Sequence, residues 1–291
     1  MNAPSVFFNL VKDGIKMNYK SFKIIDSHCH IFPDKIAAKA TKSTDVFYGM
    51  TDSGIKTSDF IGSVDTLIKQ CEITGVEKCL VTSVATTPHH AQSINSFIAT
   101  QVRLYPDRFI GFGSLHPDSE DLLGDVEHLI DAGLKGVKLH PDIQNFKVDD
   151  PKVLKIFELC EKNSLPVLLH TGDYRFDNSN PDRVAKVLEG FPDLTIIGAH
   201  FGGWSVWEEA AKKLTKYQNF YVDTCSSFYT LDKDTAKKLI EAYGTHRVIF
   251  GTDFPMWKQA DELEHLFSLG LSESELKNIL QMNLLRVLKL A

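Results

Sequence analysis

The stretch KIIDSHCH, from Lys23 to His30, decides how the rest of this sequence is interpreted. It is a short run of β-branched residues followed by two histidines two positions apart. In a β-strand successive side chains alternate between faces, so His28 and His30 point the same way and Cys29 points the opposite way. In a helix the two histidines would lie on nearly opposite sides. Two imidazoles on one face of a strand are half of a metal site or simply a polar strand end, and the pair alone leaves both readings open.

The overall composition narrows the class of protein. The chain has 291 residues, 43% of them hydrophobic and 24% charged, as in globular proteins with ample material for a core. Its net charge of −6, without blocks of like charge, argues against nucleic acid or a membrane surface as partner. We see no stretch apolar and long enough to span a bilayer. The five scattered cysteines lack a CxxC pair, which favours a reducing compartment, and we expect a cytoplasmic protein.

Beyond residue 61 the sequence alternates between short apolar runs and longer segments with a helical pattern. The runs that predict strands after the first one are 79–84, 109–113, 136–139, 166–169, 194–197, 220–222 and 247–250. Asp150 followed by Pro151 is a typical helix start, with an N-cap and a proline in the first turn. The segment from Phe32 to Ile61 is rich in Thr, Ser, Asp and Gly, and we interpret it as a long functional loop.

Strands that alternate with helices predict parallel βαβ units, and continuous apolar runs are typical of strands buried on both faces. Eight such units predict a single (β/α)8 TIM barrel over residues 23–291, with an N-terminal extension over residues 1–22 and an extra C-terminal helix. A doubly wound sheet is the alternative. It is disfavoured because the turn after its first strand is usually rich in glycine, whereas this turn reads DSHCH.

Polar residues follow most of the predicted strands at the point where each strand ends. In chain order they are His28, His30, Lys138, His140, His170, His200 and Asp253. A solvated loop would explain any one of them, but it does not explain several histidines and an aspartate at the same structural position. Catalytic groups of (β/α)8 barrels come from the carboxyl ends of the strands. The sequence therefore predicts one polar site at this end of the barrel.

Five motifs in this order give the chain a family resemblance. They are DSHCH (26–30), GVKLHP (136–141), LLHTG (168–172), IIGAHFGG (196–203) and FGTDFP (250–255). Each motif is weak alone, but the ordered set resembles the amidohydrolase superfamily of metal-dependent TIM-barrel enzymes. Within it, the chain resembles the amidohydrolase-related branch, which also contains non-oxidative decarboxylases. The resemblance runs from about Ile24 to the C-terminal helix.

The resemblance implies a divalent metal centre. It implies that His28, His30 and His170 bind the ion, that Asp253 is the last ligand, and that His200 is an acid/base or carries a second metal. Three imidazoles and a carboxylate leave a position for water, which a bound metal makes nucleophilic near neutral pH. Asp253 is expected to orient or deprotonate that water and thus to be catalytic. Zinc is the favoured metal, with one ion favoured over two.

Other strand-end and loop residues are expected to bind the substrate. Lys138 and His140 share a face of one strand, and Lys138 is expected to be unmodified and to face the substrate rather than to be a carboxylated bridge between two metals. Arg175, in the loop after His170, is expected to hold a substrate carboxylate, with a solvated loop residue as the alternative. Asp26 shares the strand parity of the two histidines, which predicts a partner of the metal ligands or a barrel-floor carboxylate.

Hydrolysis of an amide, ester or lactone of a small polar molecule is the favoured reaction, and non-oxidative decarboxylation at the same site is the alternative. In the decarboxylases an arginine near the first loop commonly holds the carboxylate, whereas here the first arginine of the chain is Arg103. A TatD-like nuclease would carry an acidic ligand where Lys138 stands. A non-catalytic metal-binding protein would not need the full ligand set. We expect a small molecule as the partner, and a homodimer stays open.

Overall fold

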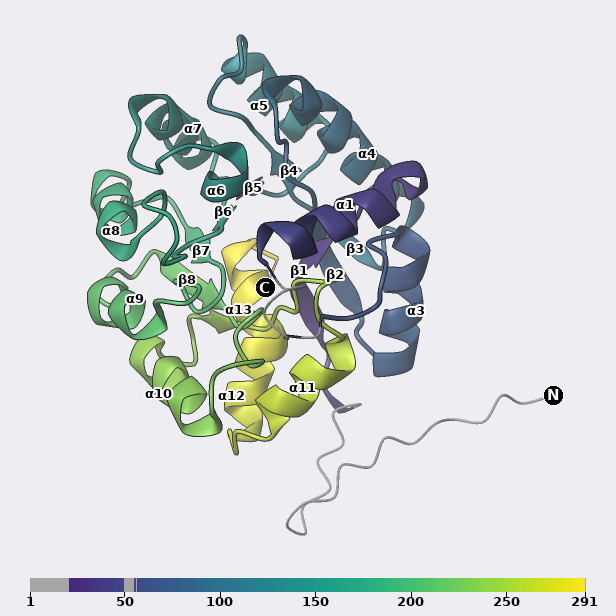
Figure 1. Ribbon diagram of the computed structural model, residues 1–291, viewed down its shortest axis with the longest axis vertical. Coiled ribbons are helices and arrows are strands. Elements are labelled where there is room, and N and C mark those ends of the chain that lie inside the picture. The colour runs from purple at the N-terminus through teal and green to yellow at the C-terminus, as the bar shows by residue number, and fades with distance from the viewer. Residues whose placement is uncertain (1–20, 50–54, 56, 291) are drawn as a thin grey trace, which may run out of the picture.

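The computed structural model describes residues 21–49, 55 and 57–290. Within this part of the chain, parallel strands alternate with helices and form a ring at the centre (Figure 1). The strands are β1 (Ile25–His30), β2 (Lys78–Thr82), β3 (Phe109–Gly111), β4 (Gly113–Ser114), β5 (Val137–Leu139), β6 (Val167–Leu169), β7 (Ile196–Gly198), β8 (Phe220–Asp223) and β9 (Val248–Ile249). Only Phe112 separates β3 from β4, so these two are pieces of the single strand that the sequence predicts.

The structure has several longer helices, and all but the first of them surround the strands (Figure 1). They are α1 (Asp34–Phe47), α3 (Val64–Thr74), α4 (Ala91–Leu104), α5 (Leu122–Asp131), α7 (Pro151–Lys162), α8 (Pro181–Gly190), α9 (Trp207–Leu214), α10 (Lys233–Tyr243) and α11 (Gln259–Phe267). Short turns of helix, η2 (Pro88–His90) and α6 (Pro141–Gln144), lie in connections. The predicted final helix is α12 (Glu273–Lys277), a π-helical segment η3 (Asn278–Met282) and α13 (Asn283–Val287) in succession.

Backbone hydrogen bonds link the last strand to the first. The strands pair in the orders β1-β2-β3 and β4 to β9, and all pairs are parallel. The gap between the two ends is bridged by Ser27, whose N–H donates to Phe250 O at 2.9 Å, and by His30, whose N–H donates to Phe254 O at 2.7 Å. The predicted barrel fold is confirmed.

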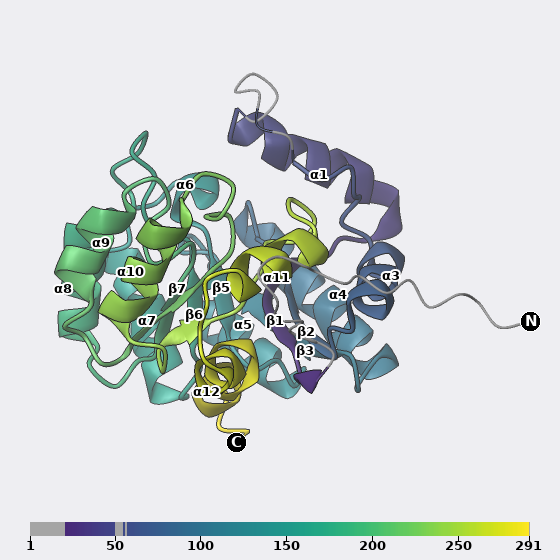
Figure 2. The same cartoon turned by 90° about the horizontal axis from the view of Figure 1, so that it is seen from below.

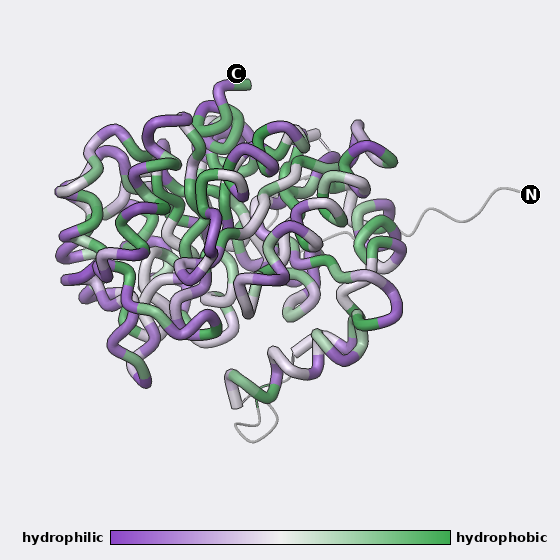
Figure 3. Tube along the Cα trace, turned by 90° about the horizontal axis from the view of Figure 1, so that it is seen from above, coloured by the Kyte–Doolittle hydropathy of each residue, from purple (hydrophilic) through white to green (hydrophobic). Residues whose placement is uncertain are grey.

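Every second side chain of a strand points into the interior of the ring, because successive side chains of a β-strand alternate between its two faces. Leu168 on β6 and Ile197 on β7 belong to this inner cluster, whereas their neighbours pack outward against the helices. Leu284 and Val287 of α13 belong to the same cluster, so the C-terminal helix covers the end of the barrel at which the strands begin. The opposite, carboxyl ends of the strands are left to polar residues. Figure 3 shows the hydrophobic segments concentrated in the body of the barrel.

The prediction of a loop from Phe32 to Ile61 is wrong in its first half, because Asp34–Phe47 forms the helix α1. Ala37 is the only residue of α1 that is fully buried, because this helix borders the cavity and is not packed into the core. Figure 2 shows α1 standing apart from the ring of helices, and its residues line the cavity at the strand ends. We call α1 together with Tyr48 the cap.

The predicted N-terminal extension, residues 1–22, lies outside the described residues except for its last two. Phe22 packs edge-on against the Phe267 ring, with 5.6 Å between ring centroids. Among the helices that the structure describes, none combines the length and the apolar character needed to cross a membrane.

Candidate metal centre

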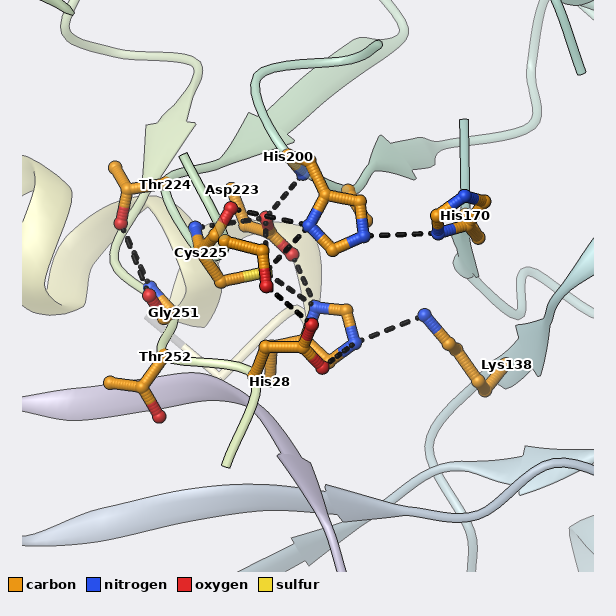
Figure 4. A network of polar contacts seen from close by, with 12 residues as sticks. His28, Lys138, His170, His200, Asp223, Thr224, Cys225, Gly251 and Thr252 are labelled. Carbon is orange, nitrogen blue, oxygen red and sulfur yellow. Dashed lines mark hydrogen bonds and ion pairs between the residues drawn. The ribbon is translucent and has the colours of Figure 1, made fainter. Parts of the chain in front are cut away.

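The carboxyl ends of the strands open into a cavity of about 480 Å³ beneath the cap. Strand alternation explains much of its polar lining. Leu168 and Ile249 face inward, so His170, two residues after Leu168, and Asp253, four residues after Ile249, are expected to face inward as well. All seven strand-end residues of the sequence analysis line this cavity: His28, His30, Lys138, His140, His170, His200 and Asp253. Figure 4 shows four of them, His28, Lys138, His170 and His200, converging from different strands.

Three of these side chains are spaced like the ligands of one ion. His28 Nε2 lies 3.2 Å from His30 Nε2, and Asp253 Oδ1 lies 3.6 Å and 3.3 Å from the same two nitrogens. With metal–ligand bonds of about 2.1 Å, donors of a tetrahedral ion stand about 3.4 Å apart and those of an octahedral ion about 3.0 Å apart. Two imidazoles and a carboxylate on one face of an ion leave other positions for substrate. The donor set therefore fits a divalent metal.

The protonation of His28 suits a ligand. Its Nδ1 lies 2.8 Å from Asp223 Oδ2, and because a carboxylate accepts, Nδ1 carries the proton and Nε2 keeps its lone pair. Asp223 is fully buried on β8. Burial alone would raise the pKa of this carboxyl, but the neighbouring His28 and His200 lower it overall, so Asp223 stays ionised. For the same reason the pKa of Asp253 lies well below its usual range despite burial.

Backbone strain turns His200 into the cavity. Ile197 on β7 and Ala199 just after the strand both belong to the inner cluster, so simple alternation would point His200 outward, but its φ of 62° leaves the strand conformation. Its backbone N–H donates to Asp223 Oδ1 at 2.8 Å, and its Nδ1 donates to the Cys225 carbonyl at 3.2 Å. Burial lowers the pKa of His200 to about 4. His200 is therefore neutral at pH 7 and presents an unprotonated Nε2 to the cavity.

His170 is paired differently from the other predicted ligands. Its Nδ1 lies 3.0 Å from His200 Nε2, and its Nε2 lies 3.4 Å from Asp142 Oδ2, although neither of these last two atoms has a hydrogen-bond partner among the described residues. The pKa of Asp142 is raised to about 7 by burial. Because His200 Nε2 is unprotonated, the 3.0 Å contact is a hydrogen bond when His170 Nδ1 carries the proton. Its assignment as a ligand stays a prediction.

Lys138 and His140 project from the end of β5 on the same side, as predicted for substrate-facing residues. Lys138 is 1% exposed, and its Nζ lies 3.0 Å from His28 Nε2. Burial lowers the pKa of Lys138, in the direction that favours the neutral amine. The His140 ring stacks on the His170 ring at 4.0 Å, and burial holds the pKa of His140 well below its usual value.

Asp26 does not share the orientation of the two histidines, so that prediction is wrong. A β-bulge between Asp26 and Cys29 shifts the pairing of β1 with β2 by one residue and reverses the parity. Asp26 points outward instead. It accepts hydrogen bonds from the Thr252 N–H at 3.0 Å, the Thr252 hydroxyl at 2.6 Å and Gln259 Nε2 at 2.9 Å. Since Thr252 precedes Asp253, this buried carboxylate positions the loop that carries a candidate ligand.

Arg175 is not among the residues that line the cavity, contrary to its predicted role. Its guanidinium forms a bidentate pair with Asp173, with Nε at 2.9 Å from Oδ1 and a terminal nitrogen at 2.6 Å from Oδ2. The other terminal nitrogen donates to the Phe47 carbonyl at 2.9 Å, at the end of α1. A guanidinium with these partners has little capacity left for a substrate carboxylate. The structure gives Arg175 the role of a clamp on the cap.

Two residues of the site escaped the sequence analysis. Asp223 could have been found, since it ends β8 just as His170 follows β6, but the predicted strand stopped one residue short of it. Tyr48 follows α1, and its hydroxyl lies 2.6 Å from His140 Nε2. Burial raises the pKa of Tyr48 well above its usual value, so the phenol keeps its proton. Tyr48 was missed because it lies within the segment that the sequence analysis interprets as a loop, where no pattern singles it out.

Comparison with known proteins now gives the family. The sequence profile of the amidohydrolase family matches residues 25–290. The chain belongs to the amidohydrolase family. This amidohydrolase is 32% identical over 118 residues to 2-amino-3-carboxymuconate-6-semialdehyde decarboxylase of Dictyostelium discoideum. The matched stretch is 39% of this chain and spans only 33% of that relative.

Solved structures share the fold of this amidohydrolase at lower sequence identity. A TIM-barrel protein of Bordetella bronchiseptica superimposes with a TM-score of 0.77 at 22% identity, over 92% of this chain and 99% of that one. A dihydroxybenzoic acid decarboxylase of Polaromonas sp. JS666, solved with bound manganese and the inhibitor 2-nitroresorcinol, gives a TM-score of 0.68 at 17% identity. It covers 92% of this chain and 97% of its own. Both matches agree with the TIM-barrel fold of this chain.

Proposed function

We propose that this amidohydrolase removes CO2 from a small unsaturated or aromatic carboxylic acid without a redox change, at a divalent metal held by His28, His30 and Asp253. The observation that carries the proposal is the face of three donor atoms, 3.2–3.6 Å apart, at the base of the cavity. The decarboxylase relative and the manganese-containing decarboxylase with a like fold support this reaction over the hydrolysis favoured by the sequence analysis.

The shape and lining of the cavity suit such a substrate. A volume of about 480 Å³ accommodates a single-ring acid. Apolar side chains from the cap and from the barrel line its outer part, including Phe32, Ile36 and Met256. They keep water from a bound carboxylate, and the loss of neutral CO2 relieves the cost of holding that charge out of water. Two lysines line the cavity among the described residues: Lys39 at the exposed mouth and Lys138 at the base.

Each polar residue then has a task that its environment supports. A bound divalent ion would polarise an oxygen of the substrate. Lys138, buried beside His28, donates hydrogen bonds to substrate oxygens. His200 is unprotonated at neutral pH, so its Nε2 accepts a proton from the substrate or from water and returns it to the carbon that has lost CO2. In this step the carbon–carbon bond breaks, its electron pair stays on the ring carbon, and that carbon takes the proton.

Zinc and manganese are both compatible with the donor set, and we propose zinc as the first metal to test because imidazole suits it well. The chelated protein should be reloaded with zinc or with manganese and offered carboxyl-13C-labelled hydroxybenzoates and unsaturated dicarboxylates. Release of 13CO2 that requires the metal supports the proposal. Lactones and amides should be tested in parallel. Their metal-dependent hydrolysis, without CO2 release from the acids, would show that the proposed decarboxylation is wrong.

The His200→Asn variant tests the proton transfer. Turnover should fall by roughly 10²–10⁴-fold because the acid/base is lost, while bound metal per chain stays near the wild-type value. Asp182→Asn is a matched control, since Asp182 is an exposed carboxylate on α8 that pairs with Lys213. Full turnover in the His200 variant would remove this residue from the mechanism.

A further inference from the structure

Tyr48 brings a hydroxyl from the cap to the histidines of the barrel. Its hydroxyl lies 2.6 Å from His140 Nε2 and 3.4 Å from His170 Nδ1. Its ring packs edge-on against Trp204, with 5.3 Å between centroids, and it lines the cavity together with the candidate metal ligands. A substrate bound at the base of the cavity would therefore meet this hydroxyl.

The hydrogen bonds of His140 decide which way the Tyr48 proton points. His140 is the N-cap of α6, and its Nδ1 accepts a hydrogen bond from the backbone N–H of Ile143 at 3.3 Å. A nitrogen that accepts carries no proton, so the proton of the neutral ring sits on Nε2. Nε2–H then donates to the Tyr48 oxygen. The phenol proton is not used in this contact and is free to point elsewhere.

We propose that Tyr48 is a catalytic residue of this site, whose hydroxyl donates a hydrogen bond to an oxygen of the bound substrate, with His140 fixing the direction of its proton. Among the described residues, the contact left for that proton is the long one to His170, and a substrate oxygen is a better acceptor. The inference rests on the proposed function for the identity of the substrate, but the direction of the proton follows from the described contacts alone.

The position of Tyr48 is fixed from the side of the barrel by the clamp. Arg175 donates to the Phe47 carbonyl at 2.9 Å, one residue before Tyr48, and is itself paired with the buried Asp173. Its guanidinium carbon also lies over the Tyr48 and Trp204 rings, 5.5 Å from each centroid. This arrangement limits the rotation of the Tyr48 side chain, which makes its hydroxyl a preorganised donor.

The first test needs no substrate. Nitrogen-15 NMR of the histidine rings in the metal-loaded protein, with His140 assigned through the His140→Gln variant, reports which ring nitrogen carries the proton. We expect the Nε2–H form of His140. The Nδ1–H form would overturn the proposal, because Tyr48 would then donate to His140 and not to the substrate.

The second test compares the binding of two probes, 2-hydroxybenzoate and benzoate, to the wild type and to Tyr48→Phe. The two probes differ by one hydroxyl oxygen. The metal-loaded wild type should bind 2-hydroxybenzoate more tightly than benzoate, and this preference should fall about tenfold in Tyr48→Phe, the effect of one lost hydrogen bond. Since binding is measured and not turnover, the result is independent of whether the protein decarboxylates either acid. Equal affinities in the wild type, or an unchanged preference in Tyr48→Phe, would overturn the proposal.

A double-mutant cycle separates the orientation of the Tyr48 hydroxyl by His140 from simple packing between the two side chains. The measured quantity is again the preference for 2-hydroxybenzoate over benzoate. His140→Leu should reduce it in the wild type, because the Tyr48 hydroxyl is no longer oriented, and should add nothing in the Tyr48→Phe background. Additive effects would show that His140 does not act through Tyr48. Metal content and the midpoint of thermal unfolding of each variant show that the fold is retained.

Discussion

The two walls of the cavity are built on different principles. The wall that carries His28, His30 and Asp253 belongs to β1 and to the segment that follows β9, where backbone hydrogen bonds join the two ends of the barrel sheet. The opposite wall is the cap, which stands outside the ring and is attached through contacts such as those of Arg175 and Tyr48 (Figure 2). The first wall is rigid because its backbone is part of the sheet. The second depends on a few side chains, so we expect it to open more easily.

The difference extends to the residues behind each wall. Behind the metal ligands, buried carboxylates fix the geometry: Asp223 binds His28 and the His200 backbone, and Asp26 binds Thr252 (Figure 4 shows Asp223 between the two histidines). Behind the cap, Arg175 pairs with Asp173, and its guanidinium also lies over the Phe47 and Phe176 rings. Changes to the barrel wall should therefore affect metal binding, and changes to the cap wall should affect substrate binding.

The largest effect is expected from Asp253→Asn. The amide removes the only anionic donor among the three candidate ligands, so metal content should fall and turnover should decrease by roughly 10⁴-fold. Metal analysis by mass spectrometry and a 13CO2 assay measure the two quantities. Normal metal content with normal turnover would show that the ion is held elsewhere.

Asp223→Asn should have the next largest effect. Loss of a carboxylate behind a metal-binding histidine typically lowers metal affinity about 10–100-fold, because the tautomer of His28 is no longer fixed. Competition with a fluorescent chelator gives the affinity, and the substrate KM at saturating metal should change little. A changed KM with unchanged metal affinity would place Asp223 in substrate binding instead.

Arg175→Met should affect the cap wall alone. The variant keeps an apolar side chain within the aromatic rings but cannot bind Asp173 or Phe47, so the cap should loosen and KM should rise roughly tenfold, the effect of one or two lost hydrogen bonds to charged groups. Metal affinity, measured as for Asp223→Asn, should stay the same. Equal loss of metal affinity in both variants would contradict the separation of the two walls.

A separate effect, on neither wall's binding function, concerns the stability of the metal-free protein. Because burial lowers the pKa of His200 from 6.5 to about 4, the unfolded chain binds more protons than the folded one between these values. Stability should therefore fall as the pH is lowered from 6.5 to 4, with His200 contributing on the order of 3 kcal/mol in total. Urea unfolding at several pH values should show a weaker decline in His200→Gln. An identical decline would mean that His200 is not neutral in the folded protein.

The sequence by itself determined the barrel and most of its catalytic end. Apolar runs too short for helices, separated by helical segments, leave few arrangements other than parallel strands, and the carboxyl ends of those strands must meet at one place. This is why His28, His30 and Asp253, far apart in the chain, could be predicted as neighbours. The polar strand ends were informative because their position follows from connectivity and not from side-chain detail.

Only the tertiary structure decided the orientations of individual side chains. The bulge in β1 turned Asp26 outward, the positive φ of His200 turned that ring inward, and Arg175 found a carboxylate and a carbonyl instead of a substrate. Strand parity holds only where pairing is regular, and a one-residue irregularity reverses it without any sign in the composition. The cap was missed for a related reason. The helix α1 borders the cavity and buries only Ala37 fully, so the position of the cap and of Tyr48 became visible only from their contacts in the folded protein.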